Sequence, residues 1–433
     1  MFALGIDFGT SGARAIALNQ SEEIVAHAKY AFSAEEVSSP AAWRRTLWIL
    51  LEKIDSPVRA CLGRIAVNGT SATVLLCDRS ITPLTPALLY NDKTARSALA
   101  KIQHIAPADS PALSATSSLV KAMWWCDTLS ESIRAQVSLL CHQSDWIAAQ
   151  LHRQVPVSDY HNALKLGYNV RKLRYPEWLL KRPIASWLPT VKAPGEVIGP
   201  IAVEIAQRFS IAETCQICTG TTDSIAAFIA SSAMIPGEAV TSLGSTLVLK
   251  LLSETPIDHS TFGIYSHRLG DLWLVGGASN TGGAVLKRYF SDERLVQLSE
   301  QIDLSKPCDL NYYPLNSPGE RFPINDPDYL PRLMPKPERE VDFLYGMLSA
   351  IARIEAEGYQ KLHELGAPVA NRIYTAGGGA KNEKWQLLRQ RYLSRENPVE
   401  VRRADNTEAA YGTAKLALKG LKDYQRRSRE LQS

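Results

Sequence analysis

The sequence lacks the features of several protein classes. No apolar run approaches the roughly 20 residues that a helix needs to cross a bilayer, so no membrane partner is expected. The first residues contain neither a basic segment nor a small-residue cleavage site, which argues against secretion. The formal net charge of +4 is small for 433 residues, and bulk charge therefore gives no argument for nucleic-acid binding.

Cysteine is sparse and irregularly placed. The seven cysteines form an odd set without regular spacing, which is typical of reduced thiols and predicts a cytoplasmic protein. Cys215 and Cys218 have the spacing of a redox or zinc pair, but no second pair accompanies them. Because they also lie in a strand-like run, a structural role is favoured over metal binding.

Familiar catalytic motifs are missing as well. The sequence contains no GxxxxGK[ST], no GxSxG and no HExxH, and no GxGxxG follows the first expected strand. Asp7-Phe8-Gly9 spells the DFG of protein kinases, but six preceding residues cannot hold the glycine-rich loop and HRD motif that those enzymes require. P-loop NTPases, protein kinases and α/β-hydrolases are thereby excluded.

What is present predicts two α/β domains. A chain of 433 residues exceeds the roughly 250–300 residues at which single cores stop growing. Alternating apolar residues predict a hairpin over 3–18 with a turn at Gly9–Gly12, and a similar hairpin over 239–252 with a turn at Gly244–Thr246. Since Pro236-Gly237 breaks the chain before the second hairpin, we expect domains at 1–233 and 234–433.

The remaining elements fit the same class. Helical spacing of apolar residues predicts a long helix over 340–365, ended by Gly366. Seven prolines between Pro314 and Pro337 predict a largely irregular stretch. Further strands are expected at 64–68, 73–77 and 372–376, and further helices from about 382 and over 407–419.

Glycine-hydroxyl turns suggest phosphate recognition. Thr10 and Ser11 in the first turn, and Ser245 and Thr246 in the second, combine hydroxyls with backbone N–H groups that glycine leaves accessible. Each turn alone is more typical of a simple hairpin, and only the pair favours a polyphosphate. The run Gly377–Gly379 could admit a nucleoside or form a tight turn, and Trp385 could pack on a base or in the core.

Two carboxylates are candidates for chemistry. Asp7 lies at the mouth of the first turn, where it could hold Mg²⁺ directly or through water. Asp223 follows Gly220-Thr221-Thr222 at an expected strand end. In isolation this residue is more typical of a helix N-cap, a frequent role for Asp, than of a catalytic group.

Taken in order, these motifs resemble those of the FGGY carbohydrate kinases. That family has the two-domain sugar kinase/actin/Hsp70 fold, which is ribonuclease H-like, with an interdomain cleft. The resemblance covers almost the whole chain and rests on eight segments: Gly5–Arg14, Leu88–Asp92, Val157–Ala163, Gly220–Asp223, Gly244–Thr246, Gly276–Ser279, Pro318–Pro323 and Ala376–Asn382.

The resemblance implies a role for each site residue. Asp223 would be the general base for a sugar hydroxyl, and Asp7 would place Mg²⁺. The substrate would contact Asp7, Asp223, Ser71 and the first turn from Thr10 to Arg14, that is Thr10, Ser11, Gly12, Ala13 and Arg14. ATP would be held by Thr10, Ser245, Thr246, Gly277, Gly378, Gly379, Asn382 and Trp385.

The sugar segment departs from the family. Xylulokinases carry Gly-Gln-Met-His-Gly where this chain has Asn68-Gly69-Thr70-Ser71-Ala72-Thr73. Resemblance to short pentulose kinases favours D-ribulose ahead of D-xylulose. A kinase-like ATPase with weak sugar turnover and an ATP-driven assembly protein are the alternatives, and the protein is expected to be a monomer or homodimer.

Overall fold

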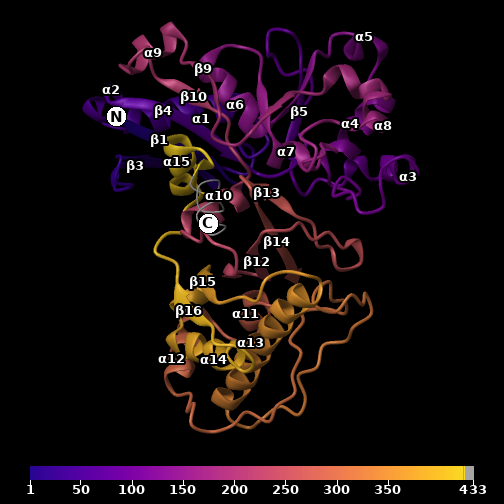
Figure 1. Ribbon diagram of the computed structural model, residues 1–433, viewed down its shortest axis with the longest axis vertical. Helices are drawn as coiled ribbons and strands as arrows, with labels where there is room; N and C mark the ends of the chain where they lie inside the picture. The colour runs from indigo at the N-terminus through magenta and orange to yellow at the C-terminus, as the bar shows by residue number, and fades with distance from the viewer. Residues whose placement is uncertain (423, 425–433) are drawn as a thin grey trace. The chain divides into compact units, whose positions relative to one another are not determined.

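The chain forms two compact units in this computed structural model, which describes residues 1–422 and residue 424. Unit 1 comprises Met1–Ala230 and the segment from Asn406, and unit 2 comprises Ser231–Asp405 and Tyr424 (Figure 1). The last residues of the predicted 234–433 domain lie outside the described range. No described helix is long and apolar enough to cross a membrane.

A six-stranded sheet forms the centre of unit 1. Strands β1, β4 and β10 run parallel at its middle, with β2 and β3 antiparallel on one side and β9 antiparallel on the other. The predicted first hairpin is confirmed as β1 and β2. The strands in sheet order are β3 (Ile24–Ala31), β2 (Gly12–Leu18), β1 (Phe2–Phe8), β4 (Leu62–Gly69), β10 (Gln216–Cys218) and β9 (Val197–Pro200).

The two faces of this sheet are covered differently. Large side chains such as Phe8, Trp43 and Trp146 form a deep core with helices α1 (Pro40–Lys53) and α6 (Gln143–His152). A cluster of small side chains on the sheet meets α15 (Ala409–Lys419), which packs beside α10 (Asp223–Ala230).

The position of α15 differs from the sequence prediction, which assigned this helix to the C-terminal domain. A Cβ on Gly5 would lie 2.2 Å from the carbonyl oxygen of Ala410, so the strand and the helix approach backbone to backbone. A Cβ on Gly412 would lie 1.9 Å from the carbonyl oxygen of Ala226 in α10. Both glycines are needed for the contact, which places this C-terminal helix in unit 1.

A separate hydrophobic cluster organises the rest of unit 1 between β4 and β9. It is built around Leu76, Leu119, Trp125 and Trp187. The elements of this region are β5 (Val74–Cys77), η1 (Thr94–Ala98), α3 (Leu99–Gln103), α4 (Ser118–Thr128), α5 (Glu131–Arg134), β6 (Leu139–His142), β7 (Val157–Asp159), α7 (Tyr160–Leu164), α8 (Glu177–Leu180), η2 (Pro183–Trp187) and β8 (Thr190–Lys192). Two more helices flank it in sequence: α2 (Ser56–Ala60) precedes β4, and α9 (Val203–Phe209) follows β9.

Unit 2 is built on a second six-stranded sheet. Its order is β13 (His267–Leu269), β14 (Leu272–Ser279), β12 (Leu247–Ser253), β11 (Glu238–Leu243), β15 (Arg372–Ala376) and β16 (Glu400–Arg403). The predicted second hairpin is confirmed as β11 and β12. The predicted long helix is confirmed as α13, and the proline-rich stretch before it is largely irregular. The helices are η3 (Ser260–Phe262), α11 (Gly283–Tyr289), α12 (Asp292–Glu300), α13 (Glu340–Glu364), η4 (Gly378–Lys381), α14 (Glu383–Leu393).

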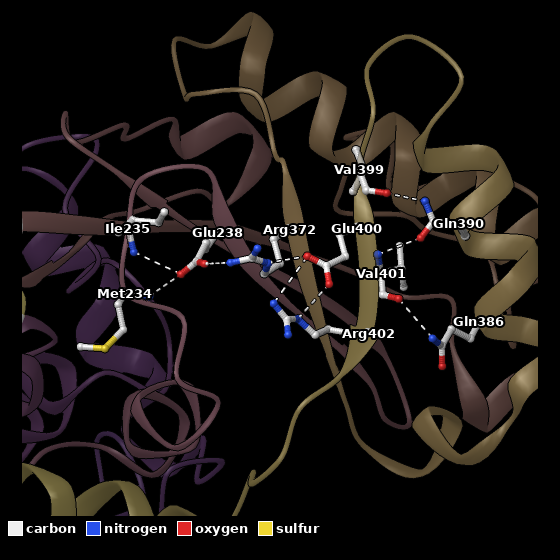
Figure 2. A network of polar contacts seen from close by, with 10 residues as sticks. All are labelled: Met234, Ile235, Glu238, Arg372, Gln386, Gln390, Val399, Glu400, Val401 and Arg402. Carbon is white, nitrogen blue, oxygen red and sulfur yellow. Dashed lines mark hydrogen bonds and ion pairs between the residues drawn. The ribbon is translucent and has the colours of Figure 1, made fainter. Parts of the chain in front are cut away.

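A polar ladder fixes the register of three strands in unit 2 (Figure 2). Arg372 on β15 donates to Glu238 on β11 at 2.8 Å and to Glu400 on β16 at 2.7 Å. Glu238 also accepts from the backbone N–H groups of Met234 and Ile235 at 2.7 and 3.2 Å. These bonds lie where the three parallel strands begin, and the resulting register sets which loops meet where the strands end.

Candidate active site

The parallel strands of unit 1 bring three sequence motifs to one edge of the sheet. Asp7 near the end of β1 lies in register with Asn68 near the end of β4. Gly69 bridges in parallel to Thr222, which directly precedes Asp223. A Cβ on Gly220 would lie 1.7 Å from the carbonyl oxygen of Val67, so this close approach requires glycine.

Asp7 is electrostatically unusual. Burial and, to a lesser extent, the charge of Asp223 raise the pKa of its carboxyl group to about 7, against the opposing effect of Arg14. Its buried Oδ1 atom has no hydrogen-bond partner among the described residues, and neither does the side-chain amide of Asn68. An unpartnered carboxylate oxygen beside a second acid suits a divalent cation, so the residues present fit Mg²⁺.

The magnesium site would not be a closed protein cage. The described residues contain no cluster of three or more His, Cys, Asp or Glu side chains suited to holding a metal. Mg²⁺ commonly keeps several waters and takes only one or two carboxylates together with substrate phosphates. Asp7 and Asp223 offer that kind of incomplete set.

Asp223 begins helix α10 and is partly exposed. Its Oδ1 accepts a hydrogen bond from the backbone N–H of Ser224 at 2.8 Å. This bond to the adjacent N–H differs from the bond to the second or third helical N–H that an N-cap side chain accepts. It does not exclude the role of a base, because a carboxylate has two oxygens that can each accept more than one hydrogen bond.

The first turn presents two hydroxyl groups at the surface of unit 1. Thr10 and Ser11 are exposed. A Cβ on Gly12 would lie 2.2 Å from the carbonyl oxygen of Tyr30, which explains the glycine. Arg14 is exposed and pairs with Glu408 at 2.7 Å. Ala13 is fully buried in the core, so its predicted contact with a substrate would have to come from its backbone.

The predicted sugar segment is held by hydrogen bonds between its own residues and with Gln143. The hydroxyl oxygens of Thr70 and Thr73 lie 2.6 Å apart, and Gln143 Oε1 accepts from the Thr70 N–H at 3.0 Å and from its hydroxyl at 3.1 Å. Thr70 and Thr73 are buried, whereas Ser71 is partly exposed. Ser71 is therefore the hydroxyl of this segment that a ligand could reach.

A buried polar cluster lies next to the Asp223 loop. His161 Nδ1 lies 2.7 Å from the hydroxyl of Thr221, two residues before Asp223. Asp159 caps α7, accepts from Asn162 Nδ2 at 2.6 Å, and has its pKa raised to about 7 by burial and by Asp145. In the sequence, Val157–Ala163 was marked only by its resemblance to the family. The pattern that could have predicted this cluster is a His and an Asn that closely follow an Asp.

The second turn and the glycine run meet in unit 2. A cavity of about 910 Å³ is lined by Gly244, Ser245, Gly378, Gly379 and Asn382, together with α12 side chains. A Cβ on Gly378 would meet nothing within 4 Å, so this residue faces open space. The volume is within the usual range for ligand pockets.

Three residues predicted to contact the nucleoside are packed against other parts of unit 2. A Cβ on Gly277 would lie 2.5 Å from the ring of Phe322, so this buried glycine makes room for packing. Trp385 is 3% exposed and lies against Gly379, where a Cβ would be 2.6 Å from its ring. Asn382 accepts from the Trp385 N–H at 3.0 Å and donates to Ser299 Oγ at 2.8 Å.

Asn382 and Trp385 line the cavity and also pack within its wall, whereas Gly277 lies against Phe322. Exposed Val296 and Leu387, which the sequence did not mark, line the cavity as well. Their apolar side chains can contact a flat base, and no local motif marked them.

The cysteine pair takes no part in either site. Cys215 and Cys218 are free and buried, and burial raises the pKa of their thiols to about 12 and about 11. Such thiols are unreactive near neutral pH.

Comparison with known families is decisive. Residues 2–230 match the N-terminal domain of the FGGY family of carbohydrate kinases, and residues 239–421 match its C-terminal domain. The chain belongs to this family. It is a carbohydrate kinase with the two-domain sugar kinase fold. The C-terminal family domain includes α15 by sequence, whereas packing places that helix in unit 1.

Individual relatives of this FGGY kinase are distant. The chain is 21% identical to the xylulose kinase of Escherichia coli (strain K12) over 436 residues, covering 96% of this chain and 89% of the relative. It is 21% identical to the gluconokinase of Bacillus subtilis (strain 168) over 313 residues, covering 67% of this chain and 60% of that protein.

Solved structures of the same fold show a similar picture. The xylulose kinase from Rhodospirillum rubrum matches with a TM-score of 0.82 at 18% identity, covering 98% of this chain and 92% of that one. The glycerol kinase from Plasmodium falciparum with ADP matches with a TM-score of 0.81 at 16% identity, covering 99% and 92%. At these identities the likeness shows the fold alone.

Proposed function

We propose that this FGGY kinase transfers the γ-phosphoryl group of ATP to a hydroxyl of a small ketopentose, D-ribulose ahead of D-xylulose. The observation that carries the proposal is the convergence of Asp7, the Asn68–Thr73 segment and Asp223 on one edge of the unit 1 sheet. An acid pair beside a reachable serine hydroxyl suits a polyol substrate and a cation-bound phosphate.

In this mechanism Asp223 accepts the proton of the sugar hydroxyl as that oxygen bonds to the γ-phosphorus. The bond from the γ-phosphorus to the bridging oxygen breaks, and ADP leaves. A positioned general base contributes typically 10²–10⁴-fold. Thr10, Ser11 and Arg14 would contact the phosphates from unit 1, and Ser245 and Thr246 from unit 2.

Mg²⁺ on the phosphates would neutralise charge that develops during transfer. Asp7 would hold that ion, directly or through water, and only its ionised form can do so. The unit 2 cavity would take the adenosine, with Gly378 allowing close approach. The interdomain cleft expected from the sequence stays a prediction.

The choice of D-ribulose as the sugar rests on the sequence of the sugar segment. Small hydroxyl residues, Ser71 among them, stand where xylulokinases carry Gly-Gln-Met-His-Gly, and resemblance to short pentulose kinases favours D-ribulose. The relatives named xylulose kinase support the alternative, D-xylulose, equally well. All seven cysteines are free, which supports a cytoplasmic location. The oligomeric state, monomer or homodimer, stays a prediction.

ADP release measured with D-ribulose, D-xylulose, glycerol and gluconate tests the proposal. D-Ribulose should give the highest kcat/KM, and Asp223→Asn should lower kcat about 10²–10⁴-fold. Asp55→Asn is a matched control: it is also an acid at a helix start in unit 1, but it makes no side-chain cap bond. It should leave kcat unchanged.

Two outcomes would redirect the proposal. Higher kcat/KM with D-xylulose would favour the alternative sugar. ADP release that no sugar stimulates, and that Asp223→Asn leaves unchanged, would favour the ATPase with weak sugar turnover.

A further inference from the structure

Lys121 on α4 is a fully buried cation. Its Nζ donates to the carbonyl oxygens of Ala72 at 2.8 Å and Leu89 at 2.6 Å. Among the described residues no carboxylate forms an ion pair with it. Burying an ammonium group without a paired acid is costly, so a lysine at this position indicates a use for the charge.

Ala72 belongs to the segment predicted to meet the sugar, and Leu89 belongs to Leu88–Asp92, one of the segments that resemble the family. Ala72 follows Ser71 directly and has a φ of 66°, a left-handed conformation that is strained for a residue other than glycine. Leu89 precedes Tyr90, whose side chain is 43% exposed and whose N–H donates to Thr73 Oγ1 at 3.0 Å. One ammonium group thus ties together two loops that are distant in sequence.

We propose that Lys121 is a positioning residue for the sugar. Its ammonium group holds the backbone of Ala72 and Leu89 so that Ser71 and Tyr90 present a preorganised surface to the ketose hydroxyls. This inference rests on the proposed function, because it assumes that the sugar meets Ser71. A site whose backbone is held in place before binding loses less entropy when the ligand arrives.

The electrostatics of Lys121 give this role a pH signature. Burial lowers the pKa of Lys121 to about 8, with Asp92 raising it and Lys165 lowering it. Hydrogen bonds from a charged donor are roughly twice as strong as neutral ones. The KM for the sugar should therefore rise as the pH passes from about 7 to about 9, while the KM for ATP changes less.

The free energy of unfolding should increase as the pH rises, while sugar binding weakens. Because the pKa in the folded protein lies below the ordinary 10.5, the folded state binds fewer protons between about pH 8 and 10.5. The contribution of Lys121 to the free energy of unfolding therefore increases with pH over that range. A merely structural lysine would not weaken sugar binding while it stabilises the fold.

The test compares Lys121→Met, Lys121→Gln and Lys121→Arg with the control Lys101→Met, an exposed lysine on α3 that pairs with Asp127. Lys121→Met should raise the KM for the accepted ketopentose about tenfold or more, with a smaller change in kcat and in the KM for ATP. Lys121→Arg, which keeps the charge, should recover part of the loss and abolish the rise of KM between pH 7 and 9. An unchanged sugar KM in Lys121→Met, or equal increases for sugar and ATP, would overturn the proposal.

Hydrogen–deuterium exchange separates this inference from the proposed function, because it needs no sugar. At constant pH, the amides of Ala72, Tyr90 and Asn91 should exchange faster in Lys121→Gln than in wild type, with the β1 amides unchanged. Protection that does not change would refute the anchoring even in an active enzyme. Faster exchange in a protein that phosphorylates no ketose would contradict the proposed function but support the anchoring of these loops by Lys121.

Discussion

The two sheets of this kinase share one plan and differ at the edge where their strands end. In each, a hairpin (β1–β2 or β11–β12) is continued by two parallel strands, β4 and β10 in unit 1 and β15 and β16 in unit 2. Two residues before the turn, unit 1 carries Asp7 and unit 2 carries Ser242. After the neighbouring strand, unit 1 has a packed polar segment and unit 2 has Gly377–Gly379 beside a cavity.

The same arrangement of strands therefore supports a charged edge in unit 1 and a glycine-lined edge in unit 2. Unit 1 accepts charge that is costly to bury, such as Asp7, Asp159 and Lys121, at or near its edge. Unit 2 has glycines at this edge, beside a cavity whose lining includes charged side chains such as Lys381, and it places a paired charge, Arg389 with Glu355, deep inside. Charge at an edge can act on a substrate, whereas a paired internal charge can only hold the fold.

Breaking the internal pair should give the largest effect on stability. Arg389 donates to Glu355 at 2.5 and 2.7 Å and to Thr375 Oγ1 at 2.6 Å, and both charged side chains are fully buried. Arg389→Met leaves the carboxylate uncompensated and should lower the free energy of unfolding by about 3–5 kcal/mol. Urea unfolding measures this change.

Two variants sharpen that result. The double change Arg389→Met with Glu355→Met removes both charges and should recover much of the loss. Arg294→Met breaks an exposed pair with Glu340 and should cost under about 1 kcal/mol. Equal losses for the buried and the exposed pair would contradict the assignment of a structural role to Arg389.

Removing the charge at the unit 1 edge should stabilise the protein and inactivate it. The folded-state pKa of Asp7 is raised from 3.8 to about 7, so the folded protein holds this proton more tightly than the unfolded chain does. Wild type therefore loses stability relative to Asp7→Asn as the pH rises from about 4 to about 7. At pH 8 the variant should be more stable by about 1–3 kcal/mol, and Mg²⁺-dependent ADP release should fall sharply.

The equivalent position of unit 2 provides the control for Asp7. Ser242→Asn should change the free energy of unfolding by less than about 0.5 kcal/mol at every pH, because no charge is removed. In wild type, kcat/KM should fall as the pH drops below about 7, where Asp7 becomes protonated. Asp7→Asn that is no more stable at pH 8 than at pH 4, relative to wild type, would show that its charge carries no cost.

Local patterns predicted the helices and strands well because hairpins and amphipathic helices depend on residues that are close in sequence. The turns at Gly9 and Gly244 and helix α13 depend on alternation, glycine and helical spacing alone. Gly277 was predicted to contact the nucleoside because Gly276–Ser279 resembles a nucleotide-contacting turn. Its packing against Phe322 could not be predicted, because Phe322 is distant in sequence. Lys121 was missed because its partners are backbone carbonyls, which leave no sequence signal.

The smallest predicted effect tests whether the unit 2 edge works by providing space. A Cβ on Gly378 meets nothing within 4 Å and its φ is not positive, so the fold should tolerate Gly378→Leu with little change in Tm. The added side chain would project into the cavity and should raise the KM for ATP about tenfold, equivalent to about 1.4 kcal/mol, with kcat less affected. Gly378→Ala, which adds one methyl group, should give an intermediate KM. If Gly378→Leu lowers Tm strongly and leaves the KM for ATP unchanged, the cavity is structural, and the contrast between a charged edge and an open edge fails.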